Sequence, residues 1–342
     1  MNVVAIRNYT RAIAVGRAAM DVGIVPLLLV IVIAAMSLIE PHFYSTGNIL
    51  NMVRNASFLA VVACGQALVL IVGGFDLSVG AVIALASVVA AKTMAWIGVV
   101  YPDEPGLAIA AGVLAALASG AGVGLLNGLC VAKLRISGFV ATIGTMSVTL
   151  GIALILTNGI PVYGLPGSFV QKFGRATWLG LPSTIYAALG AIALLVLVQR
   201  RTLLGRYIYA IGGNPEAASV SGVSLFRCQT STYVLSGILA ALTGLLLTAQ
   251  VGSGQASLGG DRMMLQSIAA AVIGGVSLRG GVGRLEIVTL ASLFLTVLTN
   301  ALNLLRIDSR LQPVLLGIIL VVAVALDELS RRNSALDRHE PT

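Results

Sequence analysis

About ten long apolar segments, separated by short charged or glycine-rich breaks, make up most of this 342-residue chain. All but the eighth, which is short, approach the roughly 20 apolar residues that a helix needs to cross about 30 Å of hydrocarbon. Only 10% of the residues are charged and 58% are hydrophobic, which is too little polar surface for a water-soluble protein. We therefore predict an all-α polytopic membrane protein with spans near 22–39, 56–73, 78–99, 106–131, 138–157, 183–199, 229–251, 265–276, 283–305 and 311–328.

The distribution of Lys and Arg predicts the orientation of these segments. If the N-terminus is cytoplasmic and all ten segments cross, fourteen Lys and Arg residues fall on the cytoplasmic side and six on the other. Cytoplasmic loops carry such an excess, so we expect residues 1–21 and 329–342 to be cytoplasmic and 22–328 to form the transmembrane domain. The net charge of +8 has the same explanation, and no basic run with interleaved aromatic residues indicates a nucleic-acid partner.

Two asparagines suggest an internal repeat. Asn127 stands seventeen residues before Gly144, and Asn300 stands seventeen residues before Gly317. The fourth and ninth segments, which contain these asparagines, run in opposite directions in the predicted topology. Inverted repeats of this kind occur in transporters, so an inverted 5+5 repeat is one interpretation of the pattern.

The fourth segment also carries three glycines at four-residue spacing, Gly120, Gly124 and Gly128. On a helix this spacing places all three on one face. Small residues on one face let a second backbone approach closely in a membrane. We predict a helix–helix contact there.

The sequence from Gly73 to Gly80, GGFDLSVG, separates the second and third segments. Its first two glycines permit backbone conformations that end a helix, and Asp76 can cap the next helix by accepting a hydrogen bond from the amide of Ser78 or Val79. An acidic residue between two apolar segments is costly unless it is satisfied in this way. The segment is either a tight interhelical turn or a broken helix that moves during transport.

The longest predicted cytoplasmic loop, residues 200–228, contains a complete short helix. Asn214 is a good N-cap, Pro215 suits the first helical position, Glu216 complements the helix dipole and Gly222 can end the helix. Gly212 and Gly213 before it predict a flexible or tightly turned approach. The helix is either an ordered loop or a docking element for a soluble partner.

Motifs for ATP binding and for catalysis are missing from the sequence. It contains no GxxxxGK[ST] loop and no HExxH, GxSxG or GxGxxG pattern. Few charges lie within or beside the apolar segments, namely Asp76, Lys92 and Glu286. Carriers driven by protons or sodium more often contain buried ionisable relays, so we expect the energy to come from another subunit. An ion-coupled secondary carrier and a membrane-embedded enzyme are the less favoured alternatives.

At three of its sequence segments the chain resembles the ribose-type sugar permeases of bacterial ABC transporters. They are GGFDLSVG at 73–80, GRYIYAIGGNPEAA at 205–218 and IAAAVIGGVSLRGGVG at 268–283. The resemblance extends from about residue 22 to 328. The chain departs from the family pattern at Ser137-Gly138, where a double proline is frequent, and at Arg284 to Thr289, where a Gly-Thr pair and small residues are usual.

The resemblance implies a multi-pass inner-membrane subunit that imports a monosaccharide. Its implied partners are a second permease chain, identical or not, a cytoplasmic ABC ATPase and a periplasmic sugar-binding protein. The chain itself would need no cofactor, because the ATPase binds Mg–ATP. A polyol or a signalling furanone is the alternative substrate. The residues implied for coupling to the ATPase are Gly205, Arg206, Gly212, Gly213, Asn214, Pro215, Glu216, Ala217, Ala218 and Gly222, and those implied for gating turns are Gly73, Gly74, Asp76, Ser78, Gly80, Gly274, Gly275, Gly280 and Gly281.

A neutral sugar needs hydroxyl and amide partners along its pathway. Five side chains on the apolar segments have this chemistry: Gln66, Asn127, Thr142, Asn300 and Asn303. Each is a candidate pathway residue, and each is equally able to form an interhelical hydrogen bond.

Overall fold

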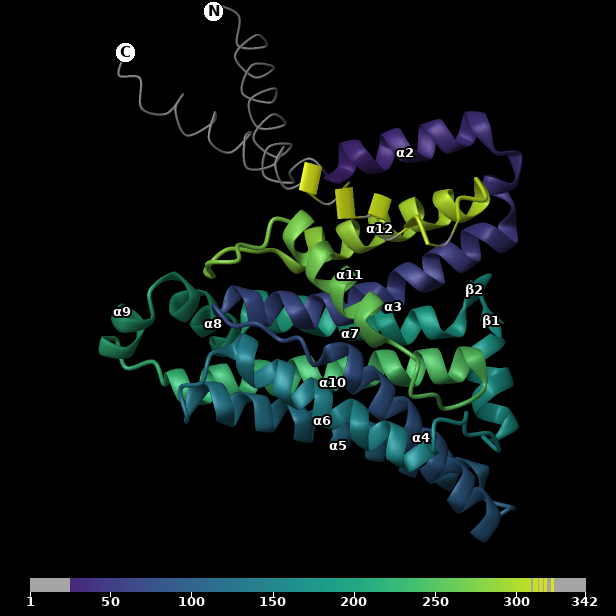
Figure 1. The fold of residues 1–342 in the computed structure, drawn as a ribbon, viewed down its shortest axis with the longest axis horizontal. Coiled ribbons are helices and arrows are strands. Elements are labelled where there is room, and N and C mark those ends of the chain that lie inside the picture. Colours follow the sequence, from purple (N-terminus) through teal and green to yellow (C-terminus); the bar gives the residue numbers. More distant parts are fainter. Residues whose placement is uncertain (1–24, 309, 313, 316, 319–320, 323–342) are drawn as a thin grey trace, which may run out of the picture.

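The computed structural model describes residues 25–308, 310–312, 314–315, 317–318 and 321–322 (Figure 1). Its α-helices are α2 (Val25–Ile39), α3 (Thr46–Ile71), α4 (Val79–Val100), α5 (Pro105–Ala132), α6 (Gly138–Thr157), α7 (Ser183–Arg201), α8 (Leu203–Gly213), α9 (Pro215–Val220), α10 (Leu225–Val251), α11 (Gly260–Ile273) and α12 (Leu285–Leu304). The short elements are η1 (Pro41–Tyr44), η2 (Ser168–Arg175) and the strands β1 (Thr177–Trp178) and β2 (Leu181–Pro182), which pair antiparallel.

Seven of the described helices are long and apolar enough to cross a membrane: α3, α4, α5, α6, α7, α10 and α12. Helix α2 is apolar but has 15 residues, and α11 has 14. This pattern agrees with an all-α polytopic membrane protein. The predicted segments 22–39 and 311–328 lie partly outside the described residues. The predicted cytoplasmic segments 1–21 and 329–342 lie wholly outside them.

The boundary that differs most from prediction is the start of the second segment. The sequence predicts a span from residue 56, but α3 begins at Thr46. Asn48, Asn51 and Asn55 lower the hydropathy of these first turns. Their backbone is nevertheless helical, and Ser45 caps it by accepting a hydrogen bond from the amide of Asn48.

The long helices lie side by side, so that connections gather at two ends of the bundle (Figure 1). We call one the α9 end. There α3 and α7 finish and the α11–α12 connection packs on them, with the Gly281 amide donating to Ile71 O at 2.8 Å. We call the other, which carries the β1–β2 hairpin, the hairpin end. There η2 packs on the end of α10, with Arg175 Nη2 donating to Val251 O at 3.1 Å.

Helices α5 and α10 form the close contact that the glycine spacing predicts. A Cβ atom on Gly120 would lie 2.3 Å from the carbonyl oxygen of Gly237, and one on Gly124 would lie 2.3 Å from that of Tyr233. The reciprocal approach holds at Gly237, where a Cβ would lie 2.1 Å from Gly120 O. Real side chains cannot occupy these spaces, so these positions require glycine for this packing.

Helices α4 and α11 both begin inside the bundle rather than at one of its ends (Figure 1). The 72–78 connection runs inward from the α9 end, and the 252–259 connection runs inward from the hairpin end. The two helix starts meet, because a Cβ on Gly80 would lie 2.3 Å from Gly260 O. Broken helices with internal ends are tolerated in membranes where protein surrounds the free backbone groups.

Candidate translocation cavity and coupling helix

The connection before α4 is held by a buried carboxylate, Asp76, which is 1% exposed. Its Oδ1 accepts from the Ser78 amide at 3.0 Å and from Ser78 Oγ at 2.6 Å, and its Oδ2 accepts from Ser236 Oγ at 3.0 Å. The predicted hydrogen bond from the Ser78 amide is therefore present. In addition Asp76 connects α4 to α10, which local sequence could not show.

This network extends to two of the predicted pathway residues. Asn127 Nδ2 donates to Ser78 Oγ at 2.9 Å, and Asn127 Oδ1 accepts from Thr145 Oγ1 at 2.6 Å. Thr142 Oγ1 accepts from the Leu77 amide at 3.0 Å and donates to Gly138 O at 2.7 Å. Both side chains are buried, so the structure places Asn127 and Thr142 as links between helices α4, α5 and α6.

Glycines in the 72–78 connection and in the α11–α12 connection have backbone angles or close contacts that exclude other residues. Gly73 has φ +86°, and in the α11–α12 connection Gly275, Gly280 and Gly281 have φ +78°, +89° and +74°. These values lie in the left-handed region that favours glycine. Two others are restricted by space, because a Cβ on Gly74 would lie 2.7 Å from Tyr233 Oη and one on Gly274 would lie 2.9 Å from the Val288 Cα.

Helix α9 is the capped helix that the sequence predicts. Asn214 Oδ1 accepts from the Ala217 amide at 2.9 Å, and Pro215 occupies the first turn. Gly222, with φ +83°, follows its end. Ala218 is buried toward the bundle, whereas Pro215, Glu216, Ala217 and Val220 are exposed.

The expectation of a flexible or tightly turned approach at Gly212 and Gly213 is wrong. Both belong to the last turn of α8. A Cβ on Gly212 would lie 1.8 Å from Ile71 O, so this glycine allows α8 to pack directly on the end of α3. Gly205 has a similar role near α7, where a Cβ would lie 2.2 Å from Gln199 O.

Polar contacts attach α8 to the neighbouring connection. Tyr209 Oη donates to Gly283 O, and Gln199 Nε2 donates to Tyr209 Oη. Burial raises the pKa of Tyr209 above its ordinary value, so this hydroxyl remains protonated at neutral pH. Nearby, Arg200 Nη2 pairs with Glu286 Oε1 at 2.7 Å. Helices α8 and α9 are thus connected to α3, α7 and the α11–α12 connection together.

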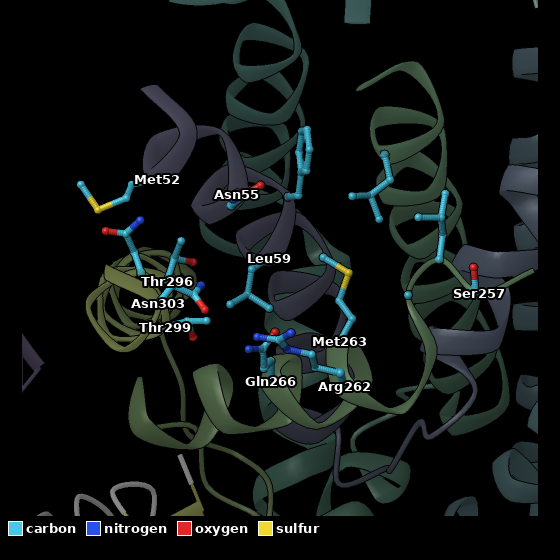
Figure 2. Close-up of a pocket in the computed structure, with 15 residues that line it drawn as sticks. Met52, Asn55, Leu59, Ser257, Arg262, Met263, Gln266, Thr296, Thr299 and Asn303 are labelled. Carbon is cyan, nitrogen blue, oxygen red and sulfur yellow. The ribbon is translucent and has the colours of Figure 1, made fainter. Parts of the chain in front are cut away.

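A cavity of about 430 Å³ lies between α3, α10, α11 and α12, on the hairpin side of the bundle. Figure 2 shows Arg262 and Gln266 of α11 near its lining side chains from α3 and α12. Eight of the lining residues are polar: Asn55, Ser257, Arg262, Gln266, Thr296, Thr299, Asn300 and Asn303. The rest are apolar or glycine, including Met52, Phe58, Leu59 and Met263.

The five predicted pathway residues are therefore divided among three environments. Asn300 and Asn303 line the cavity, and Asn127 and Thr142 belong to the Asp76 network. Gln66 is fully buried, and neither its amide nitrogen nor its amide oxygen has a hydrogen-bond partner among the described residues.

Sequence reasoning missed the other polar residues of the cavity. Asn55 of the cavity lining ends a series at three- and four-residue spacing that begins with Asn48 and Asn51, and Thr296, Thr299 and Asn303 recur at the same spacing. Such a polar stripe within an apolar stretch was the available signal, because it marks one helix face that does not contact lipid.

The fold and these sites define a class of protein: a helical membrane permease with internal helix breaks, a polar cavity and a capped helix at one end. The chain belongs to the permease-component family described as "Branched-chain amino acid transport system / permease component", which matches residues 48–324.

Within this family the chain is similar to sugar permeases over most of its length. It is 38% identical over 308 residues to the ribose import permease protein RbsC of Bacillus subtilis, covering 90% of this chain and 92% of the relative. It is 36% identical over 313 residues to the galactose/methyl galactoside import permease protein MglC of Haemophilus influenzae, covering 89% and 91%. It is 35% identical over 305 residues to the L-arabinose transport system permease protein AraH of Escherichia coli, covering 87% and 88%. These matches confirm the predicted resemblance to ribose-type sugar permeases. No solved structure matches the chain.

Proposed function

We propose that this chain is the membrane-spanning subunit of an ATP-driven importer that carries a monosaccharide across the bacterial inner membrane. The observation that carries the proposal is the nearly full-length similarity to permeases named for ribose, galactose and arabinose. The cavity supports it, because amides, hydroxyls and a guanidinium are the groups that bind sugar hydroxyls.

The α9 end is proposed to face the cytoplasm. Eight described Lys and Arg residues lie in or beside the connections at this end: Lys133, Arg135, Arg200, Arg201, Arg206, Arg227, Arg279 and Arg284. The connections at the hairpin end carry fewer described basic residues, namely Lys172, Arg175, Arg306 and Arg310, together with the acidic residues Glu40, Asp103, Glu104 and Asp308. An excess of Lys and Arg marks cytoplasmic loops. The cavity then lies in the periplasmic half, where a sugar-binding protein would deliver substrate.

Helix α9 is proposed to dock on a cytoplasmic ABC ATPase, which binds Mg–ATP and supplies the energy. Its exposed residues offer a small, self-capped surface, and α8 connects it to α3, α7 and the α11–α12 connection. A displacement of α9 is therefore transmitted to several spanning helices at once. In this proposal the chain has no ATPase site of its own.

We propose ten spans arranged as an inverted repeat, with residues 311–328 as the tenth. In this arrangement α4 and α11 are equivalent broken helices. Supporting this assignment, each begins inside the bundle after a connection that enters from the opposite end, and their starts meet at Gly80 and Gly260. Transporters with inverted repeats place such helix breaks near the membrane midplane, where substrate passes. Two permease chains, identical or different, would complete the pathway.

Reconstitution tests the proposed function. The chain is co-expressed with an ABC ATPase and a sugar-binding protein from the same source, and the complex is placed in proteoliposomes. We expect ATP-dependent uptake of radiolabelled D-ribose, D-galactose or L-arabinose, abolished when Pro215 and Asn214 are both replaced by Gly. Uptake by the chain alone under an ion gradient would contradict the proposal and favour a secondary carrier. Uptake of a polyol or furanone with none of the three sugars would reassign the substrate.

A further inference from the structure

Polar side chains line the cavity from two neighbouring helices. Helix α3 contributes Asn55, and α12 contributes Thr296, Thr299, Asn300 and Asn303. The two helices are joined near the hairpin end, where Asn48 and Asn300 exchange amide hydrogen bonds of 3.1 and 2.7 Å.

Three of the polar side chains that line the cavity have no hydrogen-bond partner in the described part of the chain. Among the residues that the structure describes, no partner accepts or donates a hydrogen bond to the side chain of Asn55, Arg262 or Gln266. Asn55 is nine residues beyond the start of α3, which is about 14 Å along a helix axis. Asn55 and Arg262 are exposed and Gln266 is half-buried, so these groups are open to hydrogen bonds from water or a ligand in the cavity.

The two α11 residues have the spacing of a binding pair. Arg262 and Gln266 are four residues apart, so they project from one face of the helix, and both line the cavity (Figure 2). Among the described residues that line the cavity, Arg262 is the only ionisable one. The hydroxyls of Thr296 and Thr299 donate to carbonyls of their own helix, at 2.9 and 2.8 Å, which leaves their oxygens free to accept from a ligand.

We infer that Arg262, Gln266 and Asn55 form a sugar-binding site within the transport pathway, an inference that rests on the proposed function. The site fits a neutral monosaccharide. A planar guanidinium donates two parallel hydrogen bonds to neighbouring hydroxyl oxygens, and an amide both donates and accepts. The apolar side chains of Phe58 and Leu59 contact the C–H face of the ring, and a volume of about 430 Å³ suits a small ligand.

The proposed site links sugar binding to the position of α11. Arg262 and Gln266 are carried by α11, whose first residue contacts the start of α4 at Gly80. The sugar would therefore be held by one of the two broken helices, on the side facing α3 and α12. Movement of α11 relative to α3 would separate Arg262 from Asn55 and release the sugar.

Uptake measurements on the reconstituted complex test this site. The variants are Arg262→Gln, Gln266→Leu and Asn55→Leu, and the matched control is Asn51→Leu, one turn away on α3 and outside the cavity lining. We expect each of the three variants to reduce the sugar transported per ATP hydrolysed at least tenfold, while the ATPase remains stimulated by the loaded binding protein. Arg262→Lys should give an intermediate ratio of sugar transported to ATP hydrolysed, because lysine retains the positive charge but lacks the planar guanidinium that donates two parallel hydrogen bonds. Wild-type ratios in all three variants would overturn the site.

Protection from chemical labelling distinguishes failure of the site from failure of the proposed function. Ser257→Cys, at an exposed lining position outside the three proposed ligands, and the control Asn51→Cys are made in a Cys130→Ala background, since Cys64 and Cys228 are buried. In the ATP-free complex, excess D-ribose, D-galactose or L-arabinose should slow modification of Cys at position 257 by a water-soluble maleimide, but not at position 51. Equal rates with and without each sugar would refute the site even if ATP-driven sugar uptake is intact. Protection without ATP-driven uptake would support the site and refute the importer.

Discussion

Two groups of polar side chains lie within the apolar bundle, and they differ in how completely they are hydrogen-bonded. Around Asp76, both carboxylate oxygens, Ser78, Ser236 and Asn127 all have partners within 3.0 Å. Around the cavity, Asn55 and Arg262 are exposed and Gln266 is half-buried, and none of the three has a partner among the described residues. In a membrane the first arrangement fixes the fold, because every group is satisfied internally. The second leaves binding capacity for a solute.

Removing Asp76 should have the largest effect on stability. Asp76→Ala leaves three buried donors, from Ser78 and Ser236, without an acceptor. At about 1–3 kcal/mol for each unsatisfied group, the loss is about 3 kcal/mol or more. We expect the melting temperature of the purified protein to fall by roughly 10 °C, measured by size-exclusion chromatography after heating. Asp76→Asn keeps one acceptor and should lose less. Asp103→Ala, in an exposed connection, is the control, and an equal loss there would contradict the structural role.

The contact between α5 and α10 is the next most sensitive feature. Gly124→Ala introduces a Cβ that would lie 2.3 Å from Tyr233 O, whereas a Cβ at Gly122 meets nothing within 4 Å. Overpacking of this kind costs about 1–3 kcal/mol. Gly124→Ala should therefore lower the yield and melting temperature of the folded protein, and Gly122→Ala should change neither. Because Tyr233 Oη also donates to Phe75 O at 3.0 Å, displacement of α10 should weaken the Asp76 region as well.

Local signals in the sequence predicted the local structures, whereas features that depend on tertiary contacts could not be predicted from it. The α9 cap at Asn214 and the Asp76–Ser78 hydrogen bond involve residues two or three apart, so their chemistry could be derived directly. The close helix contact followed from the glycine spacing. Gly212 was misinterpreted, because its reason for being glycine is Ile71 O, far away in the chain. The start of α3 was placed too late, because hydropathy identifies helix turns that face lipid and not turns that face a polar cavity.

Removal of the α9 cap should have a moderate effect on stability and a clear effect on coupling. Asn214→Ala eliminates the hydrogen bond from the Ala217 amide, at a cost of about 1 kcal/mol to the helix. We expect faster hydrogen exchange in residues 215–220 and reduced stimulation of ATPase activity by the loaded binding protein, with the spanning helices unchanged. Asn214→Ser, which retains a capping oxygen, should restore both. Normal stimulation in Asn214→Ala would exclude α9 as the coupling element.

Replacing Asn55 should have the smallest effect on stability. The direction of the change in melting temperature distinguishes the cavity from the Asp76 network. Asn55 forms no protein hydrogen bond with the described residues, so Asn55→Leu breaks none. The Asn55 side chain is also exposed at the cavity, so the substitution disturbs no buried contact. The melting temperature should therefore stay the same or rise, in contrast to the fall expected for Asp76→Ala, while sugar transport is lost. A loss of both stability and transport in Asn55→Leu would place Asn55 with the structural network. Unchanged stability with lost transport would assign Asn55 to the sugar-binding site in the cavity and not to the structural network.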